Sequence, residues 1–341
     1  IKECDWSSDV CSSDLNSQKG SRRALYYGGD TEDLAQTNSH LESYIRERFA
    51  ERGARSLKRI TFALDAYDKC ASPDGFIGLD KFSDVVAKCQ GPADEASNLY
   101  FRLVGVDRNG AGQISREAFL TYLLIVFHYG IDLSFSRKAS NQFLDVLMKL
   151  GKTYDLLHFT YGCDDITLKE IETYLHVTGY SSSLAQSIFE EIHIFARGNG
   201  RSDTISRKVF FRFLCCTDEN AMKLKYIFGS TNRRKFAAFI RCTKQISSFV
   251  RFELSSETGT LGQQFVAAFE MMGVIIPDES FVILEKYGFW GPFELESILY
   301  SLSLLHDAGL VHIGNKQVAR TTLWFSSAES KMAKQANVYV P

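Results

Sequence analysis

The sequence predicts an all-α fold of three pairs of helix–loop–helix units, with short β-bridges between the paired loops. Three observations predict it. A loop that ends in an apolar residue, with another apolar residue five positions later, recurs along the 341 residues. The segments around these loops carry apolar residues at helical spacing. Proline, which interrupts helices, occurs only five times.

Six loops carry this pattern, and the intervals between them are uneven. The leading residues are Ile77 (IGLDKF), Ile114 (ISREAF), Ile166 (ITLKEI), Ile205 (ISRKVF), Leu261 (LGQQF, one residue short) and Phe293 (FELESI). They are separated by 37, 52, 39, 56 and 32 residues, so short intervals alternate with long ones. This alternation predicts three pairs of units.

Each loop is expected to lie between two helices. The incoming segments repeat apolar residues at helical spacing, at Leu57, Ile60 and Leu64, at Leu99, Leu103 and Val106, at Phe143, Leu147 and Leu150, and at Ile188, Ile192 and Phe195. A hydroxyl residue that can cap the outgoing helix follows the leading isoleucine in three loops. The predicted pairs span residues 35–132, 133–217 and 218–309, and residues 310–341 form a tail.

The N-terminal residues 1–34 are treated separately. The stretch DWSSDVCSSDL, from Asp5 to Leu15, resembles the translation of a sequencing adapter and has no amphipathic period. Residues 1–34 are therefore predicted to be adapter-derived and disordered. The native start is then masked, which leaves organelle targeting open. The other cysteines show no CxxC spacing, which favours reduced thiols in an intracellular, cytoplasmic protein.

Composition and motifs argue against several classes of function. The formal net charge is −2, which disfavours nucleic acid as a partner. The longest apolar run, from Tyr122 to Phe127, is far shorter than the roughly 18 residues of a membrane span. No phosphate-binding glycine motif, nucleophile elbow or paired-histidine zinc motif occurs, so no enzyme is predicted. Two side-chain groups are expected to be buried and inert: the histidines His158, His176 and His193, and the thiols of Cys215 and Cys216.

The loops resemble those of the EF-hand superfamily. A calcium loop of that family has twelve residues, with glycine at the sixth position and glutamate at the twelfth. The leading residue of each repeat matches the eighth position, where paired loops form a short bridge. The segment from Arg52 to Arg55 (RGAR) also resembles calcyphosine-like proteins just before their first hand. The first pair matches best, and the later hands are degenerate.

The resemblance implies Ca²⁺ as a ligand, and the best loop for it runs from Asp107 to Ala118. The implied ligands are Asp107, Asn109, Ala111 (at the fifth position), Gln113 and Ser115. Ala111 and Ala118 stand where acids are expected. Glu117 is one residue early, which turns its side chain about 100° away from the ion. Binding of Ca²⁺ is therefore expected to be weak or absent.

The first loop is the second candidate for calcium. It is predicted to span eighteen residues from Asp65, where the family has thirteen, and to use Asp65, Asp68 and Asp74 as ligands. Lys81, however, occupies the twelfth position. The third loop keeps Glu170 at that position, yet it and the remaining loops are predicted to be structural.

Two functions remain open at this point. The first is a calcium-binding or calcium-responsive adaptor, in which ion binding exposes apolar surface. The second is a calcium-independent scaffold subunit of a larger assembly. For both, the resemblance implies protein partners that bind as a helix in a groove or on the surfaces of the pairs.

Overall fold

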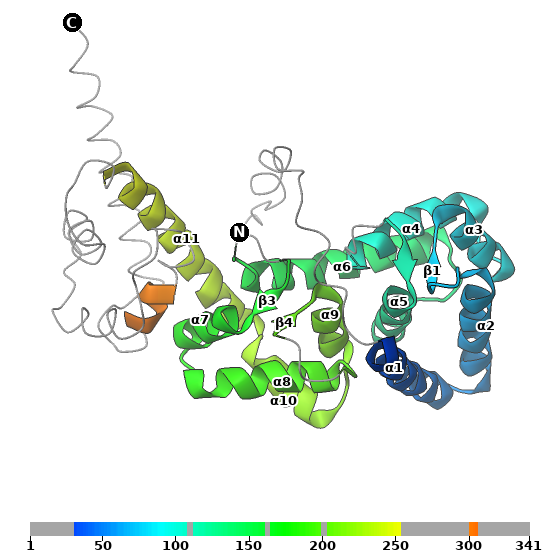
Figure 1. Ribbon diagram of the computed structural model, residues 1–341, viewed down its shortest axis with the longest axis horizontal. Coiled ribbons are helices and arrows are strands. Elements are labelled where there is room, and N and C mark those ends of the chain that lie inside the picture. The colour runs from blue at the N-terminus through cyan, green and yellow to red at the C-terminus, as the bar shows by residue number, and fades with distance from the viewer. Residues whose placement is uncertain (1–30, 108–111, 161–163, 199–202, 254–299, 306–341) are drawn as a thin grey trace, which may run out of the picture.

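The computed structural model describes residues 31–107, 112–160, 164–198, 203–253 and 300–305. Of these residues 76% are helical, and they include eleven helices together with two small antiparallel sheets (Figure 1). The prediction of a mostly helical chain with short bridges is confirmed. The two leading residues of the predicted third pair, Leu261 and Phe293, lie outside the described residues, as does the segment that resembles an adapter.

The first half of the described chain contains five helices and one bridge. Its elements are α1 (Thr31–Glu51), α2 (Ala54–Cys70), β1 (Phe76–Ile77), α3 (Leu79–Lys88), α4 (Ala93–Asp107), β2 (Ile114–Ser115) and α5 (Arg116–His128). Strands β1 and β2 pair with Ile77 opposite Ile114. We refer to α2–α5 as the first pair. Its bridge joins two of the leading residues that the repeat pattern singled out.

The second half repeats this order and then continues into further helices. Its elements are α6 (Arg137–Leu157), β3 (Ile166–Thr167), α7 (Leu168–Thr178), a short 3₁₀ turn η1 (Ser182–Leu184), α8 (Ala185–Phe195), β4 (Thr204–Ile205), α9 (Arg207–Cys215), α10 (Glu219–Ile227) and α11 (Ser230–Glu253). Strands β3 and β4 pair with Ile166 opposite Ile205. We refer to α6–α9 as the second pair.

A tyrosine supports the bridge of the first pair. The hydroxyl of Tyr67, on α2, lies 2.9 Å from the carbonyl oxygen of Ile114 and 3.1 Å from that of Gly75. Its ring stacks on Phe119 of α5, with the ring centroids 4.7 Å apart. One buried side chain thus connects both loops to the incoming and outgoing helices.

The second pair repeats this arrangement. The hydroxyl of Tyr154, on α6, lies 3.1 Å from the carbonyl oxygen of Asp164 and 3.4 Å from that of Ile205. Its ring lies against Phe210 of α9, with the ring centroids 5.9 Å apart. The two pairs are therefore internal repeats in their contacts as well as in their sequence.

Replacing Tyr67 by phenylalanine is expected to lower the free energy of unfolding by about 1 kcal/mol. The ring and its stacking stay in place, whereas both carbonyl groups lose the hydroxyl donor. The matched control is Tyr226→Phe, because the side chain of Tyr226 is 77% exposed. Urea unfolding followed by circular dichroism measures the difference. Equal midpoints for Tyr67→Phe and the parent would contradict a supporting role.

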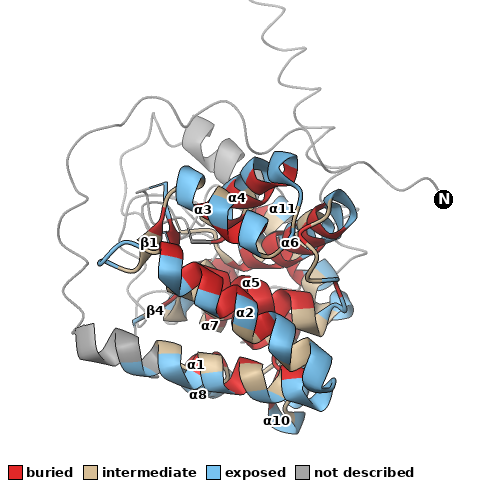
Figure 2. Cartoon of the chain, turned by 90° about the vertical axis from the view of Figure 1, so that its right-hand side faces the viewer, coloured by how far each residue is buried: buried red, intermediate tan, exposed pale blue. Residues whose placement is uncertain are grey.

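Helix α5 forms the centre of the core. Every residue from Ala118 to Val126 is buried (Figure 2). Helices α1, α4 and α9 pack around this helix. The long apolar run of the sequence is thereby accounted for by packing inside the protein. In the part of the chain that the structure describes, no helix has both the length and the apolar character to cross a membrane.

The predicted burial of several polar side chains is confirmed. His176 and His193 are each 3% exposed, and Cys215 and Cys216 are each 1% exposed. Burial raises the pKa of the Cys215 thiol to about 12, so the reactive thiolate is disfavoured. His158 is only partly buried.

Candidate functional site

The first loop is shorter than the sequence suggested. Helix α2 continues through Cys70, so Asp65 and Asp68 lie exposed on the helix rather than in the loop. Counting back from Ile77 at the eighth position places Cys70 at the first. The predicted eighteen-residue loop is therefore wrong. No glycine or proline stands between Asp65 and Cys70 to end the helix earlier.

The three acids of the first loop do not come together. Asp68 forms an ion pair with Arg116 of α5, whose guanidinium also lies 2.6 Å from Glu42. Asp74 is exposed in the turn before β1. Among the residues that the structure describes, no three His, Cys, Asp or Glu side chains are placed to hold a metal ion. Asp65, Asp68 and Asp74 therefore do not form the cluster that the sequence suggested.

The first loop is closed by its own hydrogen bonds. The backbone N–H of Ser72 donates to the carbonyl oxygen of Phe76 at 2.9 Å, and the Ser72 hydroxyl donates to the same oxygen at 3.0 Å. Gly75, at the sixth position, has φ +78°, and Gly112, at the same position of the second loop, has φ +65°. Both glycines are in the left-handed region, as this turn requires.

The second loop is described in part. Asn109, Ala111 and the side chain of Asp107 lie outside the described residues, and the backbone of Asp107 ends α4. Gln113 is exposed. The hydroxyl of Ser115 accepts a hydrogen bond from a backbone N–H in the first turn of α5 at 3.1 Å. Ser115 thus acts as the helix cap that the sequence predicted.

Glu117 turns away from the second loop, as its position predicted. Its carboxylate lies 2.5 Å from Nζ of Lys208 and 2.7 Å from the guanidinium of Arg212, both on α9. Burial by itself would raise the pKa of Glu117. The positive charges of Arg212 and Lys208 outweigh that effect and hold the pKa at about 2, well below the ordinary value of 4.5.

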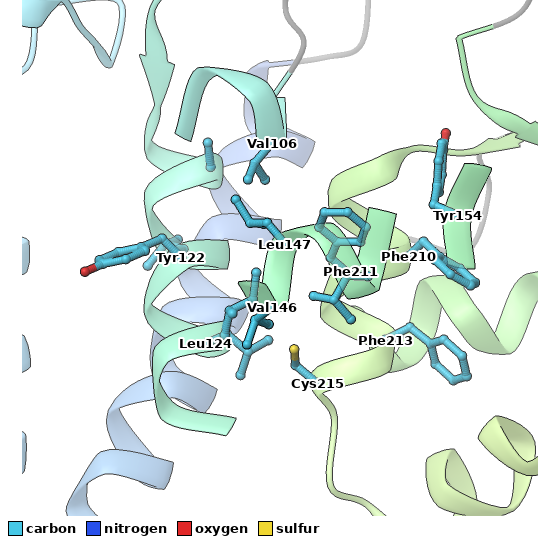
Figure 3. Packing of buried hydrophobic residues seen from close by; sticks show 14 of the residues in the cluster. Val106, Tyr122, Leu124, Val146, Leu147, Tyr154, Phe210, Phe211, Phe213 and Cys215 are labelled. Atoms are coloured by element: carbon cyan, nitrogen blue, oxygen red, sulfur yellow. The ribbon is translucent and has the colours of Figure 1, made fainter. Parts of the chain in front are cut away.

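These contacts join equivalent positions of the two pairs. Glu117 and Lys208 each stand three residues after a leading isoleucine, and Thr121 and Arg212 each stand seven residues after it. Nε of Arg212 donates to the Thr121 hydroxyl at 2.9 Å. Equivalent positions of α5 and α9 therefore face each other where the two pairs meet. Buried apolar side chains of α4, α5, α6 and α9, among them Val106, Leu124, Leu147 and Phe211, belong to one hydrophobic core (Figure 3).

The third loop is closed by Glu170. This side chain is fully buried, and one carboxylate oxygen accepts the backbone N–H groups of Phe159 and Thr160 at 2.6 and 2.7 Å. The other oxygen accepts the backbone N–H of Thr167 at 2.7 Å and its hydroxyl at 3.2 Å. The carboxylate at the twelfth position thereby holds the first, second and ninth positions of its own loop together.

Two repeated sequence signals mark an ion pair that both pairs share. The dipeptide Tyr-Asp occurs on both incoming helices, at residues 67–68 and 154–155, and the tripeptide Ile-Ser-Arg occurs in both second loops. The aspartate of each dipeptide pairs with the arginine of the matching tripeptide, Arg116 in the first pair and Arg207, at 3.7 Å, in the second. An alignment of the loops alone shows the repeated tripeptide but not the repeated dipeptide, because the dipeptide lies on the incoming helix, before the loop.

Comparison with known proteins adds no assignment to this geometry. The chain matches no protein-family model, no curated protein and no solved structure. The proposals below therefore depend on the contacts within the chain itself.

Proposed function

We propose that this chain is a calcium-independent scaffold of the EF-hand type, whose paired helix–loop–helix units hold protein partners. The observation that carries the proposal is the position of Glu170. A loop of this type is ordinarily closed by a cation that draws its oxygen atoms together. Here a carboxylate closes the loop by accepting backbone N–H groups, so the loop keeps its shape with its own side chain.

The first loop supports the same proposal. Lys81 places an ammonium group at the twelfth position, and Cys70 places a thiol at the first, 3.2 Å from Nζ of Lys88. Ca²⁺ requires six to eight oxygen ligands, so these groups do not fit it. Asp68 lies on α2 before the loop and pairs with Arg116. The loop itself is closed by the hydrogen bonds from Ser72 to the carbonyl oxygen of Phe76.

The calcium-responsive adaptor is the second candidate, and the second loop favours it. Gly112 has the left-handed conformation that a twelve-residue calcium loop needs, and Asp107 stands at the end of α4, where the first ligand belongs. Weak binding at this one loop is compatible with the other loops being closed by side chains. The two candidates therefore differ in one measurable property, the response of the second loop to calcium.

Calorimetric titration with calcium is expected to give no saturable heat up to about 1 mM, the weak end of the range for calcium loops. The parent protein and Asp107→Ala should then give the same trace. Asp74→Ala is the matched control, because Asp74 is an exposed acid of the first loop. Saturable heat in the parent that is lost in Asp107→Ala, and kept in Asp74→Ala, would establish the adaptor and contradict the scaffold.

A further inference from the structure

The thiol of Cys70 lies beside an amine. Cys70 is the last residue of α2 and stands at the first position of the first loop. Nζ of Lys88, in the last turn of α3, lies 3.2 Å from its sulfur. Among the described residues no carboxylate forms an ion pair with Lys88, so the thiol is the polar side chain that this amine contacts. A calcium loop has an oxygen ligand at the first position, so ion binding does not account for this contact.

The contact is within reach of a small oxidant. It is only part-buried, because the side chain of Lys88 is exposed and Cys70 is 9% exposed at the edge of the core. Hydrogen peroxide is close to water in size, so it can approach a sulfur in this position. The thiols of Cys215 and Cys216 are each only 1% exposed. Cys70 is therefore more accessible than either of them.

A second cysteine follows Lys88 directly. Cys89 is half-buried next to the hydrophobic core. Burial, and to a smaller extent the charge of the Cys70 sulfur, raise the pKa of the Cys89 thiol to about 11. The thiolate is the form of cysteine that attacks an oxidised sulfur, so Cys89 is a poor partner for Cys70. The amine of Lys88, in contrast, already lies in contact with Cys70.

The contact joins the C-terminal ends of the two helices of the first hand. Cys70 ends the incoming helix α2, and Lys88 ends the outgoing helix α3, with the loop and strand β1 between them. The two helices pack against each other (Figure 1). Opening of a hand of this type changes the angle between its two helices. A covalent bond between Cys70 and Lys88 would fix that angle.

We propose that Cys70 and Lys88 are an oxidation-sensitive pair, which hydrogen peroxide joins through a sulfur–nitrogen bond. In the first step the sulfur of Cys70 attacks one peroxide oxygen and the O–O bond breaks, which gives a sulfenic acid and water. The sulfur loses two electrons and the peroxide gains them.

In the second step Nζ of Lys88 forms a bond to the sulfur, and the sulfur–oxygen bond breaks. The departing hydroxide takes one proton from the nitrogen and leaves as water, and a second proton passes from the nitrogen to the solvent. A dithiol reverses the reaction, because it reduces the sulfur–nitrogen bond and is itself oxidised to a disulfide. The bond makes the first hand a redox-controlled clamp between α2 and α3.

The test treats the full chain with hydrogen peroxide and maps its peptides by mass spectrometry. The expected product joins the peptide of Cys70 to that of Lys88, with two hydrogen atoms fewer than the separate peptides, and dithiothreitol separates them again. Lys88→Arg and Cys70→Ser should each abolish this product. Lys69→Arg is the matched control, because Lys69 is an exposed lysine next to Cys70 in the chain, and it should keep the product. Urea unfolding checks that all variants are folded.

Cys89→Ser separates the amine from the second thiol. The product should persist in Cys89→Ser, whereas a disulfide between Cys70 and Cys89 in the parent would overturn the proposal. A Cys70 that stays a thiol, or is oxidised without a bond to Lys88, would overturn it as well.

The clamp has its own readout. Oxidation is expected to raise the urea midpoint of the parent, because the bond restricts the unfolded chain, and to leave that of Lys88→Arg unchanged. A bridged protein that unfolds at the same urea concentration as the reduced one would contradict the clamp.

Discussion

Replacing Glu117 by alanine is expected to lower the free energy of unfolding by about 3–5 kcal/mol. The change removes the negative partner of Lys208 and Arg212, and the side chain of Arg212 is only 1% exposed. An uncompensated guanidinium then stays buried between α5 and α9. Chemical denaturation monitored by circular dichroism measures the loss.

The matched control for Glu117 is an exposed ion pair of the same chain. Lys81 and Asp84 are 3.9 Å apart, and their side chains are 66% and 59% exposed. Asp84→Ala is expected to change the free energy of unfolding by less than about 0.5 kcal/mol. A Glu117→Ala protein as stable as Asp84→Ala would show that the contact between the two pairs does not depend on this carboxylate.

The pH dependence of stability follows from the same group. The pKa of Glu117 is about 2 in the folded protein and near 4.5 when unperturbed. Because the folded value is the lower one, the stabilisation is fully present above pH 4.5 and is lost as the pH falls toward 2. The loss is about 3 kcal/mol for this group. Glu117→Gln should flatten that part of the stability profile.

Replacing Glu170 by glutamine is expected to lower the free energy of unfolding by about 3 kcal/mol or more. An amide has only one acceptor oxygen, so its NH₂ group would face backbone N–H donors of Phe159 and Thr160 or of Thr167. These donors are held at 2.6–2.7 Å by a fully buried carboxylate in the parent. Both the charge and half of the acceptors are lost, and no water has access to replace them.

The matched control for Glu170 is Glu190→Gln on α8. Glu190 is exposed, and its carboxylate accepts one hydrogen bond from Gln186 on the same helix at 2.6 Å. This substitution is expected to change stability by less than about 0.5 kcal/mol. If Glu170→Gln unfolds at the same urea concentration as Glu190→Gln, the third loop does not depend on its carboxylate.

Much of the fold follows from the sequence pattern. The leading isoleucines mark the residues that form the two bridges, in which Ile77 lies opposite Ile114 and Ile166 opposite Ile205. Apolar periodicity marks the incoming helices because a helix must bury one face. These features are local, so a single sequence is sufficient to reveal them.

The site could be predicted only in part, because its decisive contacts join distant segments. The rotation of Glu117 away from its loop follows from helix geometry, whereas its partners on α9 depend on the way in which the pairs meet. The first loop was misjudged because an aspartate was expected at its beginning, and the helix continues through Asp65 and Asp68. The sequence does not reveal that Glu170 accepts backbone N–H groups of its own loop, because a glutamate at the twelfth position is ordinarily a ligand of the ion.

The most direct test of the account measures backbone hydrogen exchange of Phe159, Thr160 and Thr167 without and with calcium. If Glu170 closes the third loop, these three amides are protected in a calcium chelator, calcium leaves their rates unchanged, and Glu170→Gln exposes them. Fast exchange in the chelator that becomes slow when calcium is added would contradict the account, because an ion would then be closing the loop.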